Sequence, residues 1–294
     1  MKFDTFFEEV SPFHVLSKFL RRPRVDFNRL KATVIVSTGR TGTCFLARLL
    51  NKPELGMYAV HEPDPTLVEL GYDVVTGRKP VEHAKSVIIR ERANIFSAAR
   101  DKLYIESNGG LIFLLQPLKE LIPNLKVIHV VRHPVDIVRS GVNRCYISKG
   151  RVFQTYAEDQ RWKLRTTDFS DATEDWGALD IYERFMWTWA LKNNCAARFV
   201  RENPAIGLTV RFEDIFHSAD HNGFYSMLDF LNLAELSSKF SRDDFKQVVN
   251  GSKAAFAEPF EAWPSRRKAS LERICGPVVR DWDYQYSIAN GQLA

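Results

Sequence analysis

The sequence is poor in cysteine and has no long apolar run. Its four cysteines are widely separated and form no C-x-x-C pair, so neither a zinc site nor a disulfide framework is indicated. No stretch approaches the ~18 consecutive apolar residues that a membrane span needs. Internal repeats and low-complexity tracts are also missing from the sequence. These shortages exclude fibrous, disulfide-stapled and membrane-spanning proteins, and a cytoplasmic location fits best.

The bulk composition is that of one globular domain. With 294 residues and 45% hydrophobic content, the chain can bury a single large core. We expect one α/β domain over residues 1–294, in which residues 1–30 form a helical N-terminal extension that packs onto the domain. The 41 basic residues exceed the 36 acidic ones and give a net charge of +5. This excess favours an anionic ligand, but a solvated basic surface explains it equally well.

Five short apolar runs, rich in β-branched residues, alternate with helical patterns. They are predicted as strands at residues 34–36, 57–60, 103–105, 126–131 and 206–210. Such alternation predicts a three-layer α/β fold, in which helices cover both faces of a mostly parallel central sheet. In such sheets ligands bind at the carboxyl ends of the strands. A polar or charged residue follows each predicted strand, and we expect these residues to meet at one rim: Ser37, Glu62, Ser107, Arg132 and Arg211.

The region from about 144 to 180 is less regular and rich in aromatic and charged residues. We interpret it as an insertion that covers the acceptor side of the site, a role that long loops often take. From Thr166 to Glu183 the chain has six acidic residues and no lysine or arginine. This acidic stretch could hold a cationic ligand such as an amine, although a solvated acidic face is the more common outcome.

A glycine-bearing turn joins the first predicted strand to a helix. In Ser37-Thr-Gly-Arg-Thr-Gly-Thr43 several backbone N–H groups can point at one position, where the dipole of the following helix favours an anion. The nucleotide-triphosphatase pattern G-x-x-x-x-G-K-[ST] fails here, because no lysine precedes Thr43. The dinucleotide pattern G-x-G-x-x-G also fails, since two residues separate Gly39 from Gly42. The remaining interpretations are a short phosphate cradle that contains an arginine, or a plain tight turn.

A second anion seat is predicted where the fourth strand ends. In Arg132-His-Pro-Val-Asp-Ile-Val-Arg-Ser140 the strand delivers a guanidinium, and the following helix returns a hydroxyl about two turns later. Together these groups can bind a phosphate through charge-assisted hydrogen bonds. An arginine at a strand end is often only a salt-bridged edge residue. The stronger signal is therefore the presence of two anion seats in one sheet.

These two motifs resemble those of the sulfotransferases that use 3′-phosphoadenosine-5′-phosphosulfate (PAPS). In that superfamily a loop similar to Ser37–Phe45 binds the 5′-phosphosulfate, and an R-x-P-x(5)-S element similar to Arg132–Ser140 binds the 3′-phosphate. Residues 208–215 and 278–284 are looser likenesses to the family's strand-end “YED” and C-terminal “LGY” elements. The order and spacing match from about residue 33 to 284. The resemblance implies a P-loop-type fold, PAPS as cofactor, PAP as product and no need for a metal.

The resemblance also implies roles for individual residues. The loop residues would bind the 5′-phosphosulfate: Thr38, Gly39, Arg40, Thr41, Gly42, Thr43 and Cys44. Among them, Arg40 would offset charge that develops on the leaving phosphate. Arg132 and Ser140 would hold the 3′-phosphate, helped by a member of the basic cluster Arg266, Arg267 and Lys268. Phe45 or Trp162 could stack on the adenine, although we expect both rings to lie in the aromatic core.

Sulfuryl transfer needs a base that takes the proton of the acceptor. The glycan-modifying and glycolipid-modifying branches of the family place a glutamate just after the second strand, often before a proline. Glu62 in His61-Glu62-Pro63 is similar, so Glu62 is the first candidate, His61 the second and Glu106 the third. A surface carboxylate at a strand end is the alternative interpretation of Glu62.

Three functional hypotheses follow from these motifs. The first is a sulfotransferase that moves the sulfuryl group of PAPS to a hydroxyl or amine of a small-molecule or glycan acceptor. The second is a divergent, kinase-like phosphotransferase, but the Walker-type lysine that it needs is missing. The third is a non-catalytic module that binds nucleotide or nucleic acid through its positive charge and aromatic side chains. We favour the first, with no nucleic-acid partner, and a homodimer is compatible with it.

Overall fold

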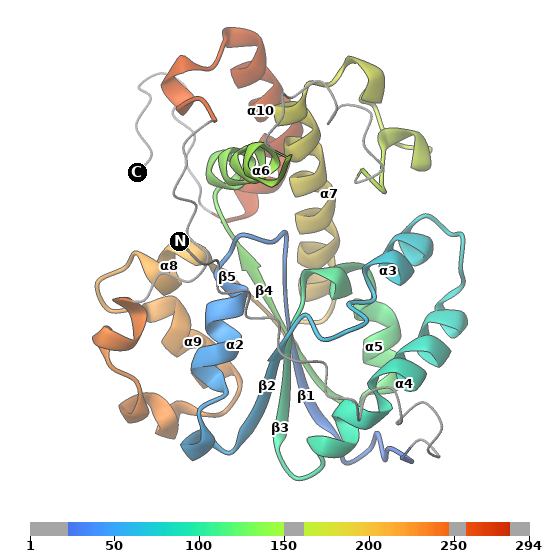
Figure 1. Ribbon diagram of the computed structural model, residues 1–294, viewed down its shortest axis with the longest axis vertical. Helices are drawn as coiled ribbons and strands as arrows, with labels where there is room; N and C mark the ends of the chain where they lie inside the picture. The colour runs from blue at the N-terminus through green and yellow to red at the C-terminus, as the bar shows by residue number, and fades with distance from the viewer. Residues whose placement is uncertain (1–22, 150–161, 247–256, 283–294) are drawn as a thin grey trace.

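The protein is built on a five-stranded parallel sheet (Figure 1). The computed structural model describes residues 23–149, 162–246 and 257–282. The strands are β1 (Lys31–Ser37), β2 (Met57–His61), β3 (Leu103–Ser107), β4 (Asn124–Val131) and β5 (Gly207–Arg211). Their order in the sheet is β2-β3-β1-β4-β5, and all neighbours run parallel. The five predicted strands and the parallel sheet are therefore confirmed.

Helices cover both faces of the sheet and give the predicted three layers (Figure 1). The described α-helices are α2 (Thr43–Leu50), α3 (Val68–Val75), α4 (Val81–Ala98), α5 (Leu115–Leu121), α6 (Pro134–Lys149), α7 (Ile181–Glu202), α8 (Phe212–Phe216), α9 (Asn222–Phe230) and α10 (Ser265–Val279). Side chains of α2, α8 and α9 form one buried cluster with the sheet. Those of α4, α5 and α7 form a second cluster on the opposite face.

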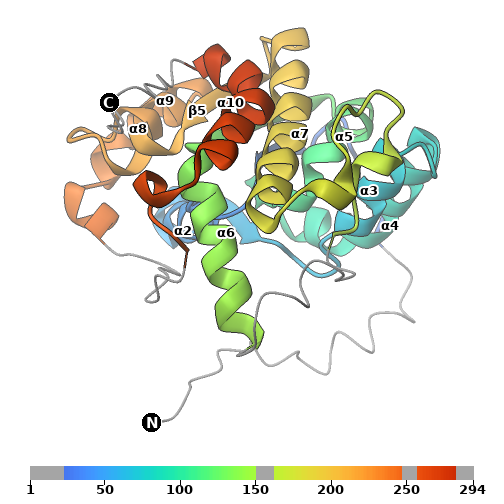
Figure 2. The ribbon, with the colours of Figure 1, turned by 90° about the horizontal axis from the view of Figure 1, so that it is seen from above.

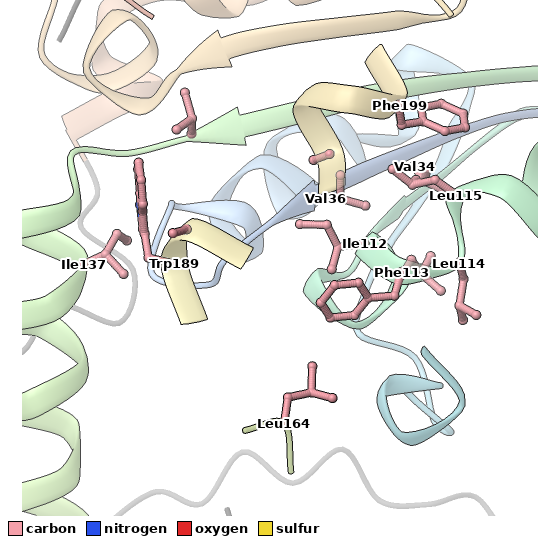
Figure 3. Close-up of a cluster of buried hydrophobic side chains, with 14 of the residues drawn as sticks. Val34, Val36, Ile112, Phe113, Leu114, Leu115, Ile137, Leu164, Trp189 and Phe199 are labelled. Carbon is pink, nitrogen blue, oxygen red and sulfur yellow. The ribbon is translucent and has the colours of Figure 1, made fainter. Parts of the chain in front are cut away.

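The central strand β1 shows why the sheet is covered on both sides. Val34 and Val36 belong to the cluster under α5 and α7, where Figure 3 shows them near Leu115 and Ile112. Ile35, between them, belongs to the cluster under α2 and α9. Successive side chains of a strand point to opposite faces, so an unbroken apolar run requires cover on both. Each such side chain stabilises the fold by about 1.5–3 kcal/mol when fully buried.

Helices α6, α10 and the first turns of α7 lie beyond the carboxyl ends of the strands (Figure 1), and from above the three helices lie side by side (Figure 2). Pro134 begins α6, as predicted, because a proline in the first turn costs no hydrogen bond. Helix α7 begins with a capping box, in which Asp180 Oδ1 accepts from Glu183 N at 2.9 Å and Glu183 Oε2 accepts from Asp180 N at 2.8 Å. These helices enclose the end of the sheet where ligands bind in such folds.

The two irregular regions differ in part from the prediction. Helix α6 continues to Lys149, so residues 144–149 are helical and do not belong to an insertion loop. Residues 162–180 are irregular, with short 3-10 turns at Thr166–Asp168 and Trp176–Ala178. Residues 1–22 of the predicted helical extension lie outside the described residues, and residues 23–30 contain a turn but no helix. Nowhere in the described parts of the chain is a helix both long and apolar enough to cross a bilayer.

Candidate active site

The carboxyl ends of the strands align at one rim, as the sequence predicts. His61 pairs with Ser107 across β2 and β3, and Val131 pairs with Arg211 across β4 and β5. Between these pairs, β1 ends at Ser37, opposite Val130. The residues that follow the strands therefore lie along one edge, and the loop after β1 lies at its centre.

The loop after β1 makes a left-handed turn into α2. Gly39, Arg40 and Gly42 have φ values of 87°, 59° and 71°, which few residues other than glycine adopt. Ser37 Oγ accepts a hydrogen bond from Gly39 N at 3.1 Å, and Gly42 is the N-cap of α2. A succession of such residues turns backbone N–H groups toward one side and forms an anion-binding concavity.

The two predicted anion seats are joined by direct hydrogen bonds. Arg40 Nε donates to Ser140 Oγ at 2.9 Å, which ties the loop to α6. Arg132 Nη1 donates to the carbonyl oxygen of Arg40 at 2.9 Å, and the Arg132 guanidinium lies 4.2 Å from the centre of the Phe212 ring. Trp189 Nε1 donates to the Arg132 carbonyl at 3.0 Å. The loop and the end of β4 thus form one continuous site.

Positive charge is concentrated at this junction. The pKa of Arg40 is lowered by burial and by the charges of Arg144 and Arg132. Arg144 was missed by the sequence analysis, although its position four residues after Ser140 on α6 places both on one helix face. The ion pair that the structure describes for Arg132 is with Asp136, at 3.4 Å. This excess of positive charge favours a ligand with several negative charges.

Two buried polar atoms at the junction have no described partner. Thr41 Oγ1 and Arg132 Nε are buried and have no hydrogen-bond partner among the described residues. Buried donors and acceptors are normally paired, so these two atoms add unused polar groups to the junction. In the described parts of the chain, no group of three or more His, Cys, Asp or Glu side chains is arranged to hold a metal ion.

Glu62 and His61 lie together at the end of β2. Glu62 adopts a left-handed conformation with φ 43°, and its N–H donates to the Ser107 carbonyl at 3.0 Å. Its side chain is half exposed, and its Oε2 lies 4.0 Å from His61 Nε2. Lys192 on α7, which sequence reasoning missed, lies within electrostatic reach: burial lowers the pKa of Lys192, and the charge of Glu62 opposes that fall. No sequence motif marks Lys192, and only the packing of α7 brings it near Glu62.

Glu106, the third candidate base, is unsuited to that role. It is 2% exposed, and its carboxylate accepts from Arg92 Nε and Nη2 at 3.0 and 2.9 Å. Tyr104 Oη and Asn108 Nδ2 donate to the same carboxylate at 2.5 and 2.8 Å. A carboxylate that is buried and held by so many donors cannot take the proton of an acceptor. The prediction of Glu106 as a base is wrong, because its ion-pair partner Arg92 comes from α4 and is not indicated by the local sequence.

The basic cluster at the start of α10 contacts the acidic stretch. Arg267 donates to Asp180 Oδ2 at 3.0 Å and to Glu258 Oε2 at 2.6 Å. Arg266 Nη2 lies 3.6 Å from Glu183 Oε2, and Lys268 Nζ donates to a backbone carbonyl. Among the contacts described for these three side chains, none reaches Arg132 or Ser140. Their role at the 3′-phosphate stays a prediction.

The acidic stretch is largely used within the protein itself. Asp180 and Glu183 cap α7 and face the arginines of α10, and Glu174 pairs with Arg273 on the same helix. Asp168 closes a turn by accepting from Arg165 N at 2.8 Å. These four carboxylates are therefore engaged by backbone N–H groups or by arginines of α10, and a cationic acceptor stays a prediction.

The two rings considered for adenine stacking lie in aromatic clusters, as the core alternative predicts. Phe45 is buried and packs against Phe216 and Phe245, with ring centres 5.5 and 5.8 Å apart. Trp162 packs edge-on against Trp176 and Phe185 at 5.6 and 4.9 Å.

Comparison with solved structures identifies the fold. A sulfotransferase from Alicyclobacillus acidocaldarius matches 89% of this chain and 94% of its own, with a TM-score of 0.50 and 14% sequence identity. The sulfotransferase STF9 from Mycobacterium avium matches 88% of this chain and 78% of its own, with a TM-score of 0.50 and 9% identity. No protein-family model and no curated protein matches the sequence. This chain thus has the three-layer α/β fold of the sulfotransferases, which confirms the predicted fold.

Proposed function

We propose that this protein is a sulfotransferase that moves the sulfuryl group of PAPS to a hydroxyl or amine of a small-molecule or glycan acceptor. The observation that carries the proposal is the Arg40–Ser140 hydrogen bond of 2.9 Å, which makes one site from two anion seats. A nucleotide with phosphates at both its 5′ and 3′ positions requires such a pair of seats. The nearby charges of Arg132 and Arg144 match the high negative charge of that ligand.

In this mechanism each side chain has a separate task. Bound PAPS would supply the sulfuryl group, whose bond to the 5′-phosphate breaks as the acceptor attacks sulfur from the opposite side. Arg40 and the N–H groups of its loop offset the charge left on the phosphate. Glu62 takes the proton of the acceptor. The end of β2 lies two strand spacings, roughly 10 Å, from the end of β1, and the acceptor would bind between Glu62 and the loop that holds Arg40.

A thermal-shift experiment tests the nucleotide specificity. We expect PAP to raise the melting temperature at concentrations where ADP and NAD do not, because only PAP carries the 3′-phosphate that Arg132 and Ser140 would hold. At a hundredfold excess over its Kd, PAP would stabilise the fold by about 2.7 kcal/mol, a shift of several degrees. Equal responses to PAP and ADP would contradict the proposal.

Replacing the proposed base separates an enzyme from a binding module. Glu62→Gln should leave PAP affinity nearly unchanged but lower turnover by ~100-fold or more, because the amide cannot accept the proton. Turnover is measured as PAP released from PAPS with a panel of phenols, alcohols and amines, and His61→Asn serves as the comparison variant. Unchanged turnover would remove Glu62 from the mechanism. Salt-sensitive binding of single-stranded DNA without turnover would favour the binding-module alternative.

A further inference from the structure

A cluster of buried polar side chains lies behind the rim, between β3 and α4. Arg92, Tyr104, Glu106 and Asn108 are each 1–2% exposed. Arg92 and Glu106 form a two-pronged ion pair, with Nε to Oε2 at 3.0 Å and Nη2 to Oε1 at 2.9 Å. Tyr104 Oη and Asn108 Nδ2 donate the remaining hydrogen bonds to the Glu106 carboxylate. We call these four residues the Glu106 cluster.

Arg92 and Asn108 of the Glu106 cluster also donate hydrogen bonds to a single loop outside it. Arg92 Nη1 donates to the Pro65 carbonyl at 2.8 Å, and its Nη2 lies 3.5 Å from the Pro63 carbonyl. Asn108 Nδ2 donates to the Thr66 carbonyl at 3.0 Å. All three carbonyls belong to residues 63–66, the segment that directly follows Glu62. Proline has no N–H of its own, so this loop depends on its carbonyl groups for attachment.

The same end of β3 also contacts the phosphate loop. Ser107 Oγ donates to the Thr43 carbonyl at 2.9 Å, and the Ser107 carbonyl accepts from Glu62 N at 3.0 Å. A Cβ on Gly109 would lie 2.9 Å from the Ser37 carbonyl oxygen, which shows how closely the two backbones pack. One short segment therefore touches both the anion seat and the loop that carries Glu62.

A buried ion pair is a poor source of stability, because desolvation of the two charges offsets most of their attraction. Its better documented use is to select one conformation among several. Glu62 needs such selection, since its φ of 43° is unfavourable for a residue with a side chain. The Glu106 cluster supplies fixed donors on the far side of the loop.

We propose that Arg92 and Glu106 act as positioning residues that hold residues 62–66 so that Glu62 faces the phosphate loop. The proposal rests on the proposed function, because it gives the cluster its role through Glu62. Neither residue touches the substrate: Arg92 acts through the carbonyl groups of the loop, and Glu106 acts by orienting Arg92.

The test replaces the charges with apolar groups of similar size in the full chain. Arg92→Met, Tyr104→Phe and Glu106→Leu are combined, because an apolar replacement of a complete buried pair often preserves stability. We expect the melting temperature and PAP affinity to stay near those of the unmodified protein. Turnover of PAPS should fall by ~10-fold or more, and amide hydrogen exchange at residues 62–68 should become faster. The matched control is the exposed ion pair on the same helix, Arg90→Met with Glu91→Leu, which should change none of these.

Two further variants distinguish a wrong positioning role from a wrong base and from a variant that does not fold. In a Glu62→Gln background the triple replacement should lower turnover by less than ~2-fold more, because both changes act on one group. Should the triple variant not fold, Arg92→Lys keeps the charge but loses the two-pronged geometry, and it should lower turnover and loop protection in the same direction. Suppose that Glu62→Gln lowers turnover, but the triple variant keeps normal turnover and normal amide protection at residues 62–68. That result would overturn the positioning role and leave the proposed base in place. Normal turnover of Glu62→Gln itself would overturn the proposed base, and with it the role of the cluster.

Discussion

At the scale of single residues, arginine side chains dominate the proposed anion site. Arg40, Arg132 and Arg144 lie close enough for their charges to repel, and the pKa of Arg40 is lowered as a result of burial and this repulsion. Such an arrangement costs free energy in the free protein, and an anion that binds there offsets that cost. The affinity for nucleotide should therefore be sensitive to each of these guanidinium groups and to salt.

The first prediction concerns Arg132. Arg132→Ala should weaken PAP binding by roughly 2–3 kcal/mol, or about 30-fold to 150-fold in Kd, because a charged hydrogen bond to phosphate is lost. Isothermal titration calorimetry measures the effect. Arg78→Ala is the control, since Arg78 is half exposed and its described ion pairs are with Asp73 and Asp168. Equal affinities for the Arg132 and Arg78 variants would contradict the assignment.

At the scale of secondary structure, the site is the junction of a strand, a turn and a helix. Gly42 ends the turn with φ 71°, and the ring of Phe216 on α8 covers it so closely that a Cβ would lie 2.5 Å away. Gly39 has a similar φ of 87°, but a Cβ there would meet no atom within 4 Å. The two glycines thus separate the effect of backbone strain from that of steric contact.

The second prediction compares these two glycines. Gly42→Ala should lower PAP affinity and melting temperature clearly more than Gly39→Ala, because both strain the backbone but only the first collides with Phe216. Adding Phe216→Leu to Gly42→Ala should recover part of the loss. Thermal unfolding with and without PAP provides the measurement. Identical losses in the two single variants would show that Phe216 has no part in shaping the loop.

At the scale of the whole molecule, a fully buried histidine links the sheet to the layer that carries Lys192 and Trp189. His129 on β4 contacts Asn193 Oδ1 on α7 at 2.9 Å and Thr209 Oγ1 on β5 at 3.3 Å. Burial lowers the pKa of His129 to about 4, although the hydrogen bond to Asn193 acts in the opposite direction. The folded protein therefore keeps this ring neutral at a pH where the unfolded chain protonates it.

The third prediction follows from that difference in pKa. The unfolded chain binds a proton below pH ~6.5, whereas the folded protein does so only near pH 4, so stability is lost as the pH falls through this window. The contribution is up to about 3 kcal/mol. His129→Gln should flatten the pH dependence of the free energy of urea unfolding between pH 7 and 4. An unchanged slope would show that other groups cause the acid sensitivity.

The sequence alone was enough to predict the elements that depend on neighbours along the chain. Apolar runs of β-branched residues predicted all five strands, since an unbroken apolar run needs cover on both faces. Glycine spacing predicted the turn at 39–42, because the required positive φ angles are local. The parallel order then placed Glu62 and Arg132 at the same rim.

What the tertiary structure decided depends on contacts between distant residues. The local sequence of Glu106 allows a catalytic base, but Arg92 on α4 forms a buried ion pair with its carboxylate. The acidic residues at 174–183 were open to a cationic ligand until α10 brought Arg267 and Arg273 against them. Lys192 carries no motif, and only the packing of α7 brings it near Glu62. A charged side chain has the same local sequence whether it is free or paired, and only the fold determines which partner lies within reach.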